Sequence, residues 1–159
     1  MKTQSIPQIK KELQFLSQKE LIELCLRLGK FKVENKALLT YLLFEANNED
    51  TYIENVKLTI SEQLSTINTN SYFYMKKSIR KALRQLKNYI KYSQKKTTHI
   101  ELLLFFCETL NELQPNIHEN KMLSNLYHRQ ICNIKKLILS VHEDLQFEYN
   151  FKLEKLNKT

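Results

Sequence analysis

The sequence predicts an all-α fold, and three observations support this. The 159 residues include one glycine, Gly29, and two prolines, whereas the hairpin turns of a β-rich protein depend on glycine. Apolar residues recur at three- and four-residue spacing along most of the chain. At three predicted helix starts a Ser or Thr has Glu or Gln three positions later, the pattern of a capping box. We expect a single domain over residues 1–159, built as a bundle or short superhelical stack of about seven or eight antiparallel helices.

Capping boxes predict where the first two helices begin. Ser5 with Gln8 starts the first helix, and Pro at the next-but-one position suits its first turn. Its inward-facing residues are expected to be Ile9, Leu13 and Leu16. Ser17 with Glu20 starts the second helix, and Gly29 follows it as a C-terminal cap.

The middle of the chain predicts one central helix and two amphipathic ones. Residues 35–46 are apolar on most sides, which is typical of a helix in the centre of a fold. The next helix has one apolar stripe, made of Ile53, Val56, Ile60, Leu64 and Ile67. A helix over residues 72–92 follows a polar break.

The last third of the chain predicts two or three more helices. Thr98 with Glu101 forms a third capping box and opens a strongly apolar helix, which we expect near the centre with the apolar middle helix. A long helix follows over residues 119–143. Apolar residues alternate as in a strand within residues 145–159. A lone strand would have no partner, so we favour a turn and a short final helix to Leu156.

Positive charge is concentrated in one segment. The chain has 25 basic and 17 acidic residues, and nine of the basic residues but none of the acidic ones lie within residues 72–96. On a helical wheel the basic side chains fall away from the apolar face and form a stripe about 28 Å long. The candidate anion-binding residues are Lys76, Lys77, Arg80, Lys81, Arg84, Lys87, Lys91 and Lys95.

This stripe indicates a non-enzymatic binding module, with nucleic acid as the leading partner. Lys and Arg neutralise phosphates and release counterions, and neighbouring tyrosines can stack on bases. Such contacts would be largely independent of sequence. Two alternatives remain open. One is a helical adaptor or regulatory protein that binds an acidic protein, and the other is a solvated helix face whose lysines reflect an AT-rich genome. An anionic membrane would also attract the stripe, although the apolar face is needed for a core.

Other residues indicate no catalytic or metal chemistry. His128 and Cys132 share a helix face, but zinc needs four ligands, and Cys107 has no basic neighbour to activate it. With one glycine, no phosphate-binding loop of the P-loop or Rossmann type can form. We expect no enzyme activity, no metal and no cofactor. The three cysteines, Cys107, Cys132 and Cys25, predict mostly buried reduced thiols, and the lack of a signal peptide or membrane-length apolar run predicts a cytoplasmic location.

One segment resembles the SAP module, a short helix–loop–helix that binds DNA. The matching residues are Leu16, Glu20, Leu21, Leu24, Gly29, Lys36, Leu39 and Leu42. The module usually has Gly where this chain has Asn35 and Arg where it has Tyr41. The resemblance implies a helix–loop–helix over residues 16–44 and a DNA contact there. More broadly, the chain looks like small all-helical bacterial proteins of unknown function, which implies a fold and no activity.

Overall fold

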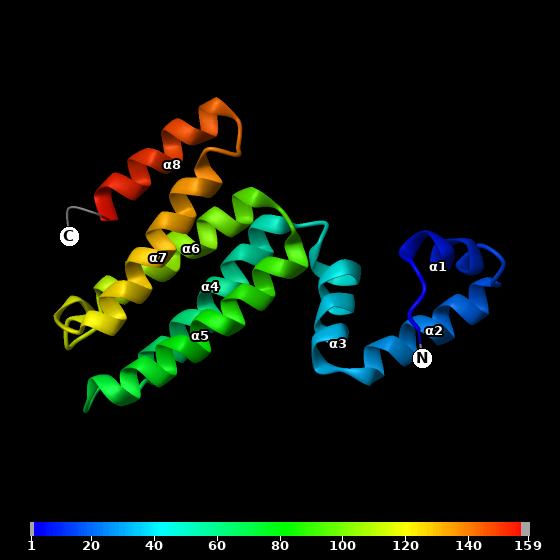
Figure 1. The fold of residues 1–159 in the computed structure, drawn as a ribbon, viewed down its shortest axis with the longest axis horizontal. Coiled ribbons are helices and arrows are strands. Elements are labelled where there is room, and N and C mark those ends of the chain that lie inside the picture. The colour runs from blue at the N-terminus through cyan, green and yellow to red at the C-terminus, as the bar shows by residue number, and fades with distance from the viewer. Residues whose placement is uncertain (1, 157–159) are drawn as a thin grey trace. The chain divides into compact units, whose positions relative to one another are not determined.

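The computed structural model describes residues 2–156, and within that range it contains helices and no strand, which confirms the all-α prediction. The helices run in chain order as α1 (Ile6–Leu13), α2 (Gln18–Phe31), α3 (Val33–Thr40), the π-helical η1 (Tyr41–Glu45), α4 (Glu49–Ser65), α5 (Tyr72–Ser93), α6 (Lys96–Asn111), the 3-10 turn η2 (Ile117–Glu119), α7 (Lys121–Ile138) and α8 (Glu143–Leu156) (Figure 1). None of these helices combines the length and the apolarity needed to cross a bilayer.

Internal contacts divide the chain into two compact units. The first unit ends at Phe44 and holds α1, α2 and α3, and the second begins at Glu45 and holds α4 to α8. The organisation as a single domain stays a prediction.

The predicted capping boxes at the starts of α1 and α2 are confirmed. The Ser5 amide donates to Oε1 of Gln8 at 3.0 Å, and the Ser17 amide donates to Oε2 of Glu20 at 2.7 Å. The Glu20 amide in turn donates to Oγ of Ser17 at 3.4 Å. These hydrogen bonds satisfy amides that lack a partner within the helix, and those from Ser17 hold the pKa of the Glu20 carboxyl below its ordinary value.

Gly29 is not a C-terminal cap, so that prediction is wrong. The residue lies inside α2, two residues before its end at Phe31, and its φ is not positive. A Cβ at this position would lie 2.9 Å from Cδ1 of Leu39. The missing side chain therefore serves the close approach of α3 to α2, which follow each other across the single residue Lys32.

The first unit lacks the buried core that its apolar residues predicted. Ile9 is 43% exposed, and Tyr41 is the one buried side chain within residues 2–44. The helix expected over residues 35–46 ends at Thr40 and continues as η1, and its apolar side chains Leu42, Leu43 and Phe44 are exposed. It is therefore not a central helix. A short helix can be covered on all sides only with several neighbours, and within this unit α3 packs chiefly against α2.

The second unit is a stack of antiparallel helices in two layers. α4, α6 and α8 form one layer, in which α6 packs against both others, and their side chains alone line a hollow on that side. α5 packs against α4 and α6, and α7 packs against α6 and α8. α6 therefore contacts all four of its neighbours, and Leu103 and Phe106 within it are fully buried. The prediction that this helix lies at the centre is confirmed.

Contacts at the helix ends fix the directions within the stack. The Tyr52 hydroxyl near the start of α4 donates to the carbonyl of Tyr89 near the end of α5, at 2.9 Å. Nζ of Lys96 at the start of α6 donates to the carbonyl of Ser140 after α7, at 3.0 Å. α5 is thus antiparallel to α4, and α7 is antiparallel to α6. Thr98 near the start of α6 also donates to Glu49 at the start of α4, so α4 and α6 begin side by side, and α5 and α7 run in the same direction (Figure 1).

Three further sequence predictions are corrected. Thr98 caps no helix, because α6 already begins at Lys96 and the buried Thr98 hydroxyl donates to Oε1 of Glu49 at 2.5 Å. α7 ends at Ile138, five residues before the predicted end. Two of the three cysteines, Cys25 and Cys132, are exposed. The preference for a final helix over a strand is confirmed by α8, whose buried residues follow a helical spacing: Tyr149, Leu153 and Leu156.

Candidate nucleic-acid interface

α5 separates its apolar and basic residues onto opposite sides. Its buried side chains face α4 and α6 and lie within an arc of about 100° on a helix of 3.6 residues per turn. They are Met75, Ile79, Ala82, Leu83, Leu86, Ile90 and Ser93. Packing of this face holds the helix in place, so the basic side chains are directed outward without needing contacts of their own.

Six of the eight predicted residues form one exposed surface, which we call the α5 row. Its members are Lys77, Arg80, Lys81, Arg84, Lys87 and Lys91. They share an arc of about 120° and extend about 21 Å along the helix. No ion pair links them to an acidic side chain within residues 2–156, so their charge is compensated only by solvent ions.

Lys76 lies at the edge of this surface and is half-buried. Its Nζ lies 3.4 Å from Sδ of Met122 on α7 and 5.9 Å from the centre of the Phe73 ring. Both contacts leave the ammonium charge uncompensated, so Lys76 can still attract an anion at the start of the α5 row.

Lys95 does not join the α5 row. α5 ends at Ser93, and Gln94 adopts a left-handed conformation with φ of 59°, which turns the chain into α6. Lys95 then precedes α6, and its Nζ lies 3.0 Å from Oε2 of Glu49. The helical wheel placed Lys95 on the stripe only because it extended α5 beyond its actual end.

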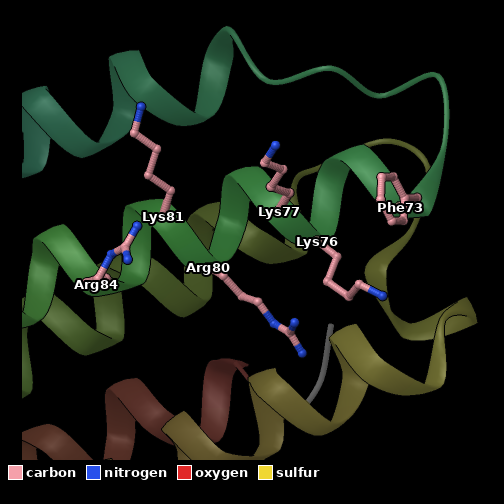
Figure 2. A pocket seen from close by; sticks show the side chains of 6 residues that line it. All are labelled: Phe73, Lys76, Lys77, Arg80, Lys81 and Arg84. Atoms are coloured by element: carbon pink, nitrogen blue, oxygen red, sulfur yellow. The ribbon is translucent and has the colours of Figure 1, made fainter.

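A shallow hollow of about 410 Å³ opens among the first residues of this surface. Phe73 and five cations line it, and Figure 2 shows their side chains spread outward from α5. Lys76 and Arg80 extend to the side on which α7 lies, whereas Lys77 and Lys81 extend to the other side. The hollow is open to solvent and lies between long side chains, so it does not enclose a small molecule on all sides.

The charge of the α5 row affects the pKa of His99, a neighbouring residue in α6. Partial burial lowers the pKa of the His99 imidazole in α6 below its ordinary value, and the nearby charge of Lys87 lowers it further. His99 is therefore neutral at pH 7 and adds no positive charge to this surface in the free protein.

Sequence reasoning missed a second basic helix, α7. Between Glu119 and Glu143 the chain has no acidic residue. The four basic residues of α7 are all exposed: Lys121, Arg129, Lys135 and Lys136. They are spread thinly along the sequence, so no local cluster drew attention to them. The signal that could have revealed them was the absence of acidic residues.

The layers of the second unit differ sharply in charge. The helices α5 and α7 together contain eleven basic residues and no acidic one. The helices α4, α6 and α8 contain ten acidic and four basic residues. The acidic side chains of that layer also pair internally: Nζ of Lys152 lies 3.1 Å from Glu101 and 2.7 Å from Glu148.

The residues considered for metal or thiol chemistry are not brought together. Within residues 2–156 no group of three or more His, Cys, Asp or Glu side chains is arranged to hold a metal ion. Cys107 is buried, which raises the pKa of its thiol to about 12. Nδ1 of His128 lies 2.8 Å from the carbonyl of Ser124 one turn earlier.

Comparison with known protein families, curated proteins and solved structures finds no match to this chain.

Proposed function

We propose that the second unit binds the phosphate backbone of nucleic acid through α5. The observation that carries this proposal is the α5 row itself, six exposed cations on one helix face that form no ion pair with an acidic side chain of residues 2–156. Like charges one turn apart repel each other and destabilise a helix. Binding of a polyanion removes that repulsion and releases condensed counterions, so it offsets the electrostatic cost of the row.

Composition alone does not account for this surface. A chain biased toward lysine would still place Glu and Asp among its lysines, as this chain does in the layer formed by α4, α6 and α8. There Nζ of Lys57 lies 2.8 Å from Oε1 of Glu54 on the same helix. The contrast between the two layers supports a binding role for α5 over a solvated face of average composition.

Salt dependence gives the most direct test. Fluorescence anisotropy of labelled duplex and single-stranded oligonucleotides is measured between about 50 and 200 mM salt. The six contacts of the α5 row by themselves predict a slope of log K against log[salt] of at least about −5 in magnitude for a duplex, which is a loss of about 1,000-fold or more over this range. Arg80→Glu/Arg84→Glu removes two contacts, so we expect the slope to fall by about 2 and the affinity near physiological salt to fall at least about 30-fold.

A matched control separates the site from the overall charge. Lys10→Glu/Lys11→Glu alters the net charge by the same amount at two exposed positions in the first unit, outside the SAP-like segment. We expect it to bind as the wild type does. The proposal fails if the wild type does not bind at the lowest salt, or if both variants lose affinity equally. Binding of an acidic polypeptide in preference to nucleic acid would favour the adaptor alternative instead.

A further inference from the structure

α7 presents a second line of polar and basic side chains beside the α5 row. Met122, Arg129 and Lys136 are spaced by seven residues, which places them on one side of a helix within about 40°. Arg129 and Lys136 line an open hollow of about 560 Å³ together with other side chains of α7: Asn125, His128, Cys132 and Asn133. We call Arg129 and Lys136 the α7 pair.

The α7 pair lies on the exposed side of its helix, within about 40° of the position through which α7 contacts α5. Met122 marks this position, because its Sδ lies 3.4 Å from Nζ of Lys76 on α5. The starts of the two helices are also joined by the Tyr72 hydroxyl, which donates to the carbonyl of Asn116 at 3.0 Å. On α5, Lys76 and Arg80 extend toward α7 (Figure 2).

The spacing of the two helices is limited by α6, which packs against both. Packed helices lie about 8–10 Å apart, so the axes of α5 and α7 are at most about 20 Å apart. The two helices run in the same direction, and on α5 the side chains of Lys76 and Arg80 extend into the space beside α7 (Figure 2). The cations of α5 and α7 therefore stand on axes at most about 20 Å apart, and the B-DNA major groove, about 12 Å wide, falls within this limit.

From this arrangement we infer that the ligand is a double-stranded nucleic acid, with one strand's phosphates on the α5 row and the other strand's on the α7 pair. The inference rests on the proposed function. A single strand has one line of phosphates and needs only the α5 row, whereas cations on two neighbouring parallel helices can each contact one of the two backbones that border a groove. The opposite layer repels a polyanion through its acidic residues, so the duplex has one favourable face to approach.

Charge reversal on α7 tests the inference apart from the proposed function. Anisotropy is measured for duplex DNA, duplex RNA and single strands with the wild type, Arg129→Glu/Lys136→Glu and Arg80→Glu/Arg84→Glu. We expect the α7 variant to lose about 30-fold in affinity for a duplex near physiological salt, with a slope reduced by about 2, and to change little for a single strand. Arg129→Gln/Lys136→Gln should lose less affinity for a duplex than the double charge reversal. It replaces that variant in the test if the double reversal does not fold.

The outcomes distinguish the two claims. If the α7 variants bind duplex as the wild type does while the α5 variant does not, the inference is wrong and the proposed function stands. An equal loss for duplex and single strand also overturns the inference. If the wild type binds no oligonucleotide, the proposed function itself fails.

Cys132 offers a second readout that needs no charge change on α7. It lines the same hollow as the α7 pair and is exposed, whereas Cys107 is buried and unreactive. A Cys25→Ser variant therefore has one accessible thiol, within the proposed site. We expect bound duplex to slow alkylation of Cys132 by about the fraction of protein bound, and a single strand to slow it less. An unchanged rate at saturating duplex would contradict the inference.

Discussion

Replacing Glu49 by alanine should destabilise the second unit strongly for a single change near the surface. The carboxylate of Glu49, at the start of α4, accepts a hydrogen bond from the Thr98 hydroxyl at 2.5 Å and another from the Ser93 hydroxyl. It also lies 3.0 Å from Nζ of Lys95. One side chain thus joins the start of α4 to the end of α5 and the start of α6.

The expected loss follows from what the removal leaves behind. Thr98 is fully buried, so losing its charged acceptor leaves a hydroxyl without a partner, which costs about 1–3 kcal/mol. Ser93 is also buried, but its oxygen accepts a second hydrogen bond from the Lys95 amide at 3.3 Å, so the cost of losing its bond to Glu49 is smaller. The side chain of Lys95 is 51% exposed and its ion pair adds at most about 1 kcal/mol. Together these give a loss of about 2–4 kcal/mol.

Urea denaturation followed by circular dichroism measures this loss. Glu62→Ala, an exposed position on the same helix, should change the free energy of unfolding by less than about 0.5 kcal/mol. Glu49→Ala/Thr98→Val should recover about 1–2 kcal/mol relative to Glu49→Ala, because both hydrogen-bonding partners are then absent. A loss below about 0.5 kcal/mol for Glu49→Ala, or strict additivity of the double change, would refute this reasoning.

Two further predictions concern His99 and Gly29. The pKa of His99 is lowered in the folded state, so the unfolded state binds protons more readily and stability falls as pH drops below the ordinary value of about 6.5. His99→Gln should flatten the dependence of unfolding free energy on pH between about 7 and 5.5, and an unchanged dependence would contradict the role of Lys87 and burial. In a Leu39→Ala background, Gly29→Ala should stabilise the protein by about 1 kcal/mol through helix propensity. With Leu39 present the gain should shrink because that side chain must move, and equal gains in thermal melts of both backgrounds would show that the two residues do not touch.

The sequence was most informative where one pattern determined both packing and exposure. α5 was predicted over residues 72–92 and spans Tyr72–Ser93, because its apolar residues repeat at helical spacing and its basic residues occupy the remaining face. Six of the eight candidate residues are consequently exposed together. Lys95 was misplaced because the helical spacing of residues continues past Ser93, where the helix actually ends. The end is made by the left-handed φ of Gln94, and a glutamine in the sequence does not predict a positive φ.

Other features depend on contacts between segments far apart in sequence. Thr98 fits a capping box, yet Glu49, forty-nine residues earlier, takes its hydroxyl instead of a helix end. Apolar residues around residue 40 predicted a central helix. Whether such a helix is buried depends on how many other helices pack around it, and a single sequence does not give that number. The basic residues of α7 are recognised as part of a larger basic surface only in the folded stack, where α7 lies in the same layer as α5.

The division of charge between the two layers has a consequence for kinetics. Because acidic and basic residues lie on opposite sides of the same small unit, the unit carries an electric dipole that a polyanion can orient before any contact forms. Association should therefore begin with rotation in the field of the ligand, and productive collisions should be a larger fraction of all collisions than for an evenly charged protein. The acidic residues of α8 would then raise the association rate constant without contacting the ligand, and would leave the dissociation rate constant unchanged.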